Sequence, residues 1–227
     1  MKLKTILLTL LLSVSLIGAS YASYQDGDDA YYKGDYETAI NEYKVSANQG
    51  NADAQNNLGL MYANGEGTLK DYKEAFKWYQ KAANQGYIIA QYNLGLMYED
   101  GVGVLKNDKQ AVKWYQKAAN QGDAVAQFYL GVKYVNGEGI LKDYKQAVKW
   151  YLKAADQGYA NAQINLGVAY FNGAGVLKDL PKAKSWMKKA YENPDASAII
   201  KERAKIATRA LEILIINNSK NNKNFTE

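Results

Sequence analysis

Apolar and small residues recur along this chain every three or four positions, which is the period of a helix with one buried face. In residues 88–98 this stripe includes Leu94 and Tyr98, and in residues 111–119 it includes Trp114 and Tyr115. The period predicts two amphipathic helices. The segment between them contains Gly-Val-Gly at 101–103, and glycine reaches the backbone angles that a tight turn needs. Residues 87–122 therefore predict a helix-turn-helix pair.

The same pair recurs every 36 residues. All four tryptophans keep this spacing, and so do a Leu-Gly pair in the first helix and a Gln-Gly pair at the end of each unit. Self-similarity at a fixed period of this size is the signature of a repeat protein. We therefore predict an all-α fold, an α-solenoid of helix-turn-helix repeats, with full repeats at residues 51–86, 87–122, 123–158 and 159–194.

The two ends of the array depart from the repeat, as terminal repeats are expected to do. Residues 23–50 are predicted to form an N-terminal partial repeat, in which Glu42 stands where a tryptophan would fall. Residues 195–217 predict one longer capping helix, whose apolar positions include Ile199 and Leu211. Residues 218–227 are polar and are predicted to be a disordered tail.

Two columns of the repeat are predicted to be structural. A glycine within a helix costs about 1 kcal/mol relative to alanine, so its recurrence predicts that the backbone of another helix passes too close for a methyl group. The tryptophans are expected to fill the gaps between repeats, where truncation to alanine should cost about 3–5 kcal/mol. The columns are Gly59, Gly95, Gly131 and Gly167, and Trp78, Trp114, Trp150 and Trp186.

The N-terminus has the features of a secretory signal peptide. Lys2 and Lys4 precede an apolar run over residues 5–18, and the small residues Ser20 and Ala22 stand before the predicted cleavage site. We assign residues 1–22 to this peptide, with an uncleaved anchor and a cytosolic chain as the alternatives. The run is shorter than the roughly 20 apolar residues of a membrane span. The mature chain is expected to be exported, periplasmic or secreted, without stable insertion in a membrane.

Composition argues against most catalytic chemistry. The chain contains no cysteine and no histidine, so the usual zinc sites, thiol nucleophiles and imidazole bases are absent. We predict no catalytic residue, no cofactor and no metal site. The formal net charge of +5 falls to +3 when Lys2 and Lys4 leave with the signal peptide, which is too small a surplus to indicate nucleic acid binding. The sequence leaves the oligomeric state open.

The full motif is similar to that of the Sel1-like repeat. Its first half reads Ala-Gln-x-x-Leu-Gly-x-x-Tyr-x-x-Gly-x-Gly, and its second half reads Ala-x-x-Trp-Tyr-x-Lys-Ala-Ala-x-Gln-Gly. The resemblance covers about residues 23–194. It implies a subclass of the tetratricopeptide superfamily, whose helical pairs stack into a right-handed superhelix and whose members commonly act as adaptors in protein complexes.

The resemblance also bears on function. Many bacterial members are exported, which implies a non-enzymatic exported scaffold that binds a protein or peptide partner. One cysteine-rich branch of the family has been linked to β-lactam binding and hydrolysis, so a β-lactam or cell-wall hydrolase is the alternative. That branch has a disulfide in each repeat, and this chain contains no cysteine.

A helical wheel separates a packing side of the first helix from the side opposite to it. At roughly 100° per residue, Tyr92, Leu96 and Glu99 lie away from the stripe that holds Leu94. In a tetratricopeptide-like stack this side lines the concave surface, and its apolar, partly aromatic composition is typical of a groove for a peptide or helix. The alternative is that these side chains pack on one another. The predicted concave face comprises Asn56, Asn57, Leu60, Tyr92, Asn93, Leu96, Glu99, Phe128, Tyr129, Val132, Ile164, Asn165, Val168 and Phe171.

One column of this face consists of asparagines at Asn57, Asn93 and Asn165, with Tyr129 in the third repeat. An amide side chain both donates and accepts hydrogen bonds, so such a ladder can hold an extended backbone without reading its sequence. The alternative is local hydrogen bonding to the adjacent turn.

Overall fold

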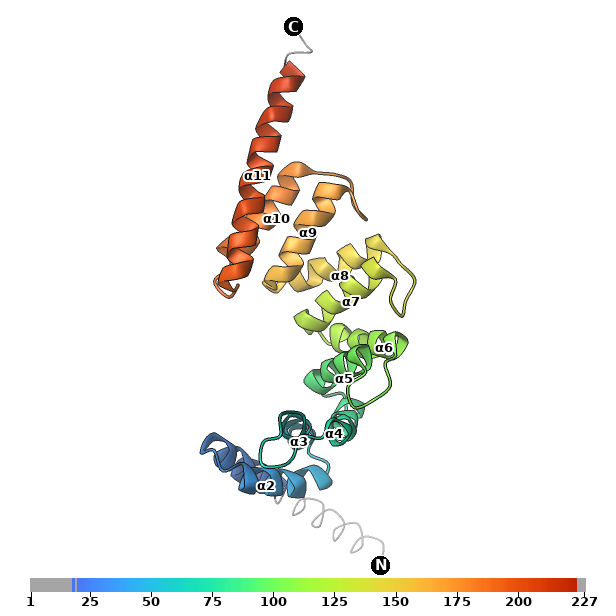
Figure 1. The fold of residues 1–227 in the computed structure, drawn as a ribbon, viewed down its shortest axis with the longest axis vertical. Helices are drawn as coiled ribbons and strands as arrows, with labels where there is room; N and C mark the ends of the chain where they lie inside the picture. Colours follow the sequence, from blue (N-terminus) through green and yellow to red (C-terminus); the bar gives the residue numbers. More distant parts are fainter. Residues whose placement is uncertain (1–17, 19, 224–227) are drawn as a thin grey trace, which may run out of the picture. The chain divides into compact units, whose positions relative to one another are not determined.

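The computed structural model describes residue 18 and residues 20–223, which form two compact units, the first ending at Trp114 and the second beginning at Tyr115. The first unit contains a helix over residues 20–32, then α2 (Tyr36–Asn48), α3 (Ala52–Asn64), α4 (Tyr72–Asn84) and α5 (Ile88–Asp100) (Figure 1). The helix α6 (Asp108–Asn120) begins in this unit and ends in the second.

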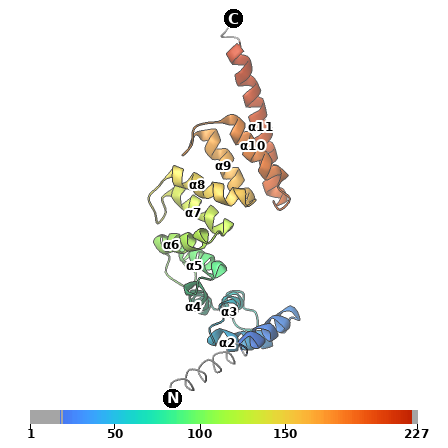
Figure 2. The same ribbon diagram turned by 180° about the vertical axis from the view of Figure 1, so that it is seen from behind.

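The second unit continues with α7 (Ala124–Asn136), α8 (Tyr144–Asp156), α9 (Ala160–Asn172), α10 (Leu180–Glu192) and α11 (Ala198–Lys223). From α2 to α5 and from α7 to α11, helices that follow one another in the sequence pack together, and α11 lies beside α10 in the views from the front and from behind (Figures 1 and 2). No strand occurs among the residues that the structure describes. The predicted all-α solenoid of repeats is confirmed.

The loops between the two helices of a repeat follow the predicted turn and capping chemistry. In the first repeat the carboxylate of Asp71 accepts hydrogen bonds from the amides of Lys73 and Glu74, which otherwise lack partners at the start of a helix. In the next repeat Gly103 has a positive φ of 71°, and a Cβ atom there would collide with the Tyr72 carbonyl oxygen. The loops that contain Gly67, Gly103 and Gly175 therefore pack closely on the helix start of the preceding repeat.

The mid-helix glycines contact a side chain, which corrects the prediction that a helix backbone passes there. A Cβ atom added to Gly59 would lie 2.6 Å from the ring of Tyr79, and one added to Gly131 would lie 2.5 Å from the ring of Tyr151. In both cases the second helix of the same repeat supplies the ring. A flat ring can lie directly on a helix only where that helix has no side chain. The tyrosine ring therefore occupies the space that the glycine leaves empty. Met187 takes the place of the ring on Gly167.

A column of buried glutamines joins each repeat to the one before it. The amide nitrogen of Gln55 donates to the Ala47 carbonyl oxygen at 3.0 Å, and Gln127 donates to the Ala119 carbonyl oxygen at 3.1 Å. These acceptors belong to the last turn of the preceding helix, where backbone carbonyls have no partner within the helix. The same bond recurs at Gln91 and Gln163. Helical periodicity placed these glutamines on the packing side but did not predict the bond.

The tryptophans lie between neighbouring hairpins. Trp78, Trp114 and Trp150 are buried and Trp186 is half-buried. Trp78 packs in one apolar cluster with residues of α2 and α3, and the Lys81 ammonium lies 3.7 Å from its ring centroid. The indole therefore fills space between two repeats while the Lys81 ammonium lies over the face of its ring.

The predicted cleavage site lies within a helix of the uncleaved chain. The helix over residues 20–32 runs across the predicted cleavage site between Ala22 and Ser23. Ser20 and Ser23 are buried against α2, where the Ser46 hydroxyl donates to the Ser20 carbonyl oxygen at 2.7 Å. Residues 1–17 of the predicted signal peptide lie outside the described residues.

The C-terminal end requires a correction. The helix α11 ends at Lys223, so residues 218–223, which we predicted as part of a disordered tail, are helical. The polar segment that begins at Asn217 contains no glycine or proline, and nothing therefore interrupts the backbone hydrogen bonds of α11. Within residues 20–223 no helix combines the length and the apolarity that a membrane span requires.

We expect Gly131→Ala to destabilise the protein by about 1–3 kcal/mol, although alanine is the better helix former by about 1 kcal/mol. The added methyl group would overlap the Tyr151 ring. Urea denaturation measures the effect. In a Tyr151→Ala background, where the ring is gone, the same substitution should lose its cost, and stabilisation by Gly131→Ala alone would contradict the contact.

Candidate functional site

Hollows between successive repeats lie along the predicted concave face, and three of them share one construction. The floor of each is a side chain seated on a helical glycine: Tyr43 on Gly27, Tyr151 on Gly131, or Met187 on Gly167. The floor residue belongs to one helix, and the walls come from the helix before it and the helix after it in the sequence. The hollows are thus a consequence of the tyrosine–glycine contact that holds each hairpin together.

The middle hollow, between α7, α8 and α9, has a volume of about 460 Å³. Val135 forms one wall, and Asn165 and Val168 form the other, above the floor residue Tyr151. Burial raises the pKa of Tyr151 to about 12, and a hydrogen bond from Asn165 partly opposes that rise. The mixed lining suits an apolar group with one hydrogen-bonding atom.

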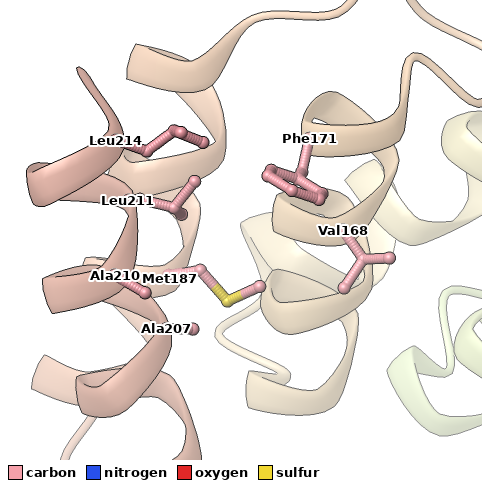
Figure 3. A pocket seen from close by; sticks show the side chains of 7 residues that line it. All are labelled: Val168, Phe171, Met187, Ala207, Ala210, Leu211 and Leu214. Atoms are coloured by element: carbon pink, nitrogen blue, oxygen red, sulfur yellow. The ribbon is translucent and has the colours of Figure 1, made fainter. Parts of the chain in front are cut away.

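The C-terminal hollow, between α9, α10 and α11, has a volume of about 340 Å³ and an entirely apolar lining. Val168 and Phe171 point into it from α9, and Leu211 and Leu214 face them from α11, with Met187 on the floor (Figure 3). Val168, Phe171 and Leu214 remain 43%, 39% and 37% exposed. Large apolar side chains therefore stay accessible around a concave space, which is typical of a binding pocket.

A further cavity of about 350 Å³ in the second unit shares lining residues with both the middle and the C-terminal hollow. It is lined by Phe128, Ile164 and Asn165 of the predicted concave face, and by Met187, Ile200, Arg203 and Ala207 of the last two helices, with Asn161. Shared lining residues make one continuous surface from α7 to α11. We call this surface, which comprises Phe128, Ile164, Asn165, Val168, Phe171 and Leu214, the α9 surface.

The structure brings together some of the predicted residues and not others. The α9 surface contains five of them: Phe128, Ile164, Asn165, Val168 and Phe171. Asn57 and Leu60 line the hollow whose floor is Tyr43, which we call the N-terminal hollow. Asn56 is only 7% exposed. Its placement on an accessible face is therefore corrected: its side chain is packed in the interior. The remaining predicted residues are half-buried: Tyr92, Asn93, Leu96, Glu99, Tyr129 and Val132.

The asparagine column is engaged within the protein at two positions. Asn57 and Asn165 hydrogen-bond the tyrosine floors of their hollows, Tyr43 and Tyr151, and each bond lowers the pKa of that tyrosine. In the third repeat the ring of Tyr129 stacks on Tyr115 with centroids 5.5 Å apart. The column therefore contacts the preceding repeat. We predicted, as the alternative to peptide binding, that these asparagines bond to the adjacent turn, whereas Asn57 and Asn165 bond to tyrosine hydroxyls.

Sequence reasoning missed the contribution of α11 to this site. We predicted that its apolar positions seal the last repeat, and Leu211 does pack against the cluster of Ala183 and Met187. The same helix also supplies one wall of the C-terminal hollow. The signal in the sequence was the pair of small residues Ala207 and Ala210, which leave space where larger side chains would fill it.

The chemistry available on these surfaces is recognition of side chains. The described residues contain no group of three or more acidic, histidine or cysteine side chains that could hold a metal ion. The α9 surface offers apolar walls, the Asn165 amide and the Arg203 guanidinium. These groups can bury an apolar side chain and bind a polar backbone beside it.

This fold and these hollows define a class of protein, an α-solenoid of helical hairpins with side-chain-sized hollows between its repeats. The Sel1 repeat model matches residues 52–87, 88–123, 124–159 and 160–195. The chain belongs to the Sel1 repeat family. Repeats of this family generally mediate protein interactions.

Two solved structures are similar in sequence and in fold. A Sel1 repeat protein from Oxalobacter formigenes is 41% identical, with a TM-score of 0.72, over 76% of this chain and 71% of the other. A protective antigen of uropathogenic Escherichia coli is 37% identical, with a TM-score of 0.74, over 81% of this chain and 40% of the other. No match was found among curated proteins.

The raised tyrosine pKa values predict a stability that depends on alkaline pH. Unfolded tyrosines lose their proton near pH 10, whereas burial raises the pKa of Tyr151 and of Tyr87 to about 12. The contribution of these protonated tyrosines to the free energy of unfolding is complete below about pH 10 and should be lost as the pH rises towards about 12. Urea denaturation across this range measures the loss. Tyr151→Phe should reduce the dependence on pH, and an unchanged dependence would contradict the assignment.

Proposed function

We propose that this chain is an exported, non-enzymatic scaffold that binds a polypeptide partner on the α9 surface, with an apolar side chain of the partner in the C-terminal hollow. The observation that carries the proposal is the apolar lining of that hollow, in which Val168, Phe171 and Leu214 stay more than one-third exposed. Water in contact with these groups is released when a partner covers them.

The dimensions of the site favour a side chain of a larger partner. A volume of about 340 Å³ lies at the low end of small-molecule pockets, which span roughly 300–1,000 Å³. The hollow continues into the cavities lined by Asn165 and Arg203, so a chain anchored by one apolar residue would extend over polar groups. An anchor in a pocket with a polar surround is the usual arrangement of an interaction hot spot.

Two further observations support export. The basic start, the apolar run and the small residues before Ser23 match a secretory signal peptide, and the Escherichia coli relative is a protective antigen. Cleavage after Ala22 would remove the contact of Ser20 with Ser46 but would keep the bond from Ser23 to Glu42, at 2.8 Å. The first hairpin therefore keeps part of its packing in the mature chain.

We expect a photo-crosslinking residue at Phe171 to capture one partner in the native organism, and Val168→Asp to reduce that product roughly tenfold, because the partner would bury an unpaired carboxylate. Gel analysis and mass spectrometry measure the product. Leu177 in the loop before α10 is 90% exposed; the crosslinker at that site, and Leu177→Asp, are the matched controls. Equal crosslinking from both sites, or no effect of Val168→Asp, would contradict the proposal.

The export prediction is tested by cell fractionation and N-terminal sequencing. The exported chain should begin at Ser23, because the small residue Ala22 fits the site that cleavage requires. Ala22→Tyr should block cleavage and Ala22→Gly should permit it. Recovery of an uncleaved chain in the cytosol would contradict export.

A further inference from the structure

The N-terminal hollow shares the construction of the middle hollow but differs in its chemistry. Both floors are tyrosines on glycine, Tyr43 on Gly27 and Tyr151 on Gly131. Counted from these glycines, the positions of Val132 and Val135 in α7 are taken by Asp28 and Tyr31 in the helix over residues 20–32. The complete lining of the N-terminal hollow, about 180 Å³ in volume, is Asp28, Tyr31, Tyr32, Tyr43, Asn57 and Leu60.

A carboxylate without a cation lies in this hollow. The Tyr43 hydroxyl donates a hydrogen bond of 2.6 Å to Asp28 Oδ1, and no ion pair of the described residues involves Asp28. The Tyr31 hydroxyl donates to Oε2 of a second acid, Glu66, at 3.2 Å. No lysine or arginine is among the lining residues. The hollow therefore has a negative charge that only solvent and hydroxyl groups balance.

Burial and a neighbouring carboxylate raise the pKa of both Tyr43 and Tyr31. Burial is the largest cause that raises the pKa of Tyr43, and the hydrogen bond with Asp28 raises it further. At Tyr31, burial and then the charge of Glu66 raise the pKa. Both hydroxyls therefore stay protonated and remain donors to the carboxylates at neutral pH.

Three tyrosines, Tyr31, Tyr32 and Tyr43, make up half of the lining residues. The rings of Tyr31 and Tyr32 meet edge to face with centroids 6.0 Å apart, and Tyr31 meets Tyr36 in the same way at 5.2 Å. Ring faces attract cations, and the attraction grows when the cation loses water. Tyr32 is 86% exposed, so it lies at the entrance to the hollow.

We propose that the N-terminal hollow binds a cationic side chain, the ammonium of lysine or the guanidinium of arginine, of a polypeptide partner. The carboxylate of Asp28 supplies the opposite charge, the tyrosines supply ring surface, and Leu60 packs on the aliphatic part of the side chain. About 180 Å³ holds the end of one side chain. The site lies in the first unit, so its test does not depend on the α9 surface.

The test uses the full chain and a blocked pentapeptide with a single lysine between glycines, titrated by NMR. We expect shifts at the helix over residues 20–32 and at α3, and about fivefold weaker binding both for the norleucine analogue and for Asp28→Asn. Asparagine keeps an acceptor for Tyr43. Asp29→Asn is the matched control, because the exposed neighbour Asp29 carries the same charge outside the hollow.

A second variant keeps the proposal testable if Asp28→Asn disturbs the fold. Because Tyr32 is largely exposed, Tyr32→Leu should leave the core intact and weaken lysine binding, whereas Tyr32→Phe should retain it. Added salt should weaken binding. Equal effects of Asp28→Asn and Asp29→Asn, equal binding of the lysine and norleucine peptides, or no binding by the wild-type chain would each overturn the proposal.

Discussion

The contact of a tyrosine ring with a helical glycine determines both the packing of a repeat and the shape of its surface. The ring of Tyr151 lies on Gly131 at a distance that leaves no room for a methyl group. The hairpin is therefore held close on the buried side, while the ring forms the floor of a hollow on the other side. Substituting the glycine would separate the helices, and substituting the ring would deepen the hollow, so stability and surface shape depend on the same pair.

The walls of the hollows differ in chemistry although their floors are alike. Tyr31 in the N-terminal hollow and Val135 in the middle hollow occupy equivalent positions over the same kind of floor, and Asp28 adds a carboxylate to the N-terminal hollow. One hollow is therefore acidic and aromatic, and the C-terminal hollow, with Val168 and Phe171, is apolar. A scaffold built this way can present different side-chain preferences in successive repeats without a change of backbone.

The sequence predicted the repeats and their helices because each column recurs four times, so that propensity, capping and periodicity agree. It predicted less well what those columns contact. A missing side chain at Gly59 shows that space is needed but not that Tyr79 fills it. Likewise the wheel placed Asn56 on the open side, although its side chain is buried. Contacts between repeats depend on how far one hairpin rotates on the next, and periodicity within a helix carries no information about that rotation.

The last helix shows why an end cap and a binding surface can be the same element. A solenoid must cover the apolar face of its final repeat, and α11 does so with Leu211 against the Met187 cluster. Ala207 and Ala210 on the same helix are too small to fill the space beside Phe171, and the hollow remains open at that point. Larger residues there would improve the seal and remove the hollow. The cap therefore closes the core with one part of its apolar face and leaves a concave apolar site with the other.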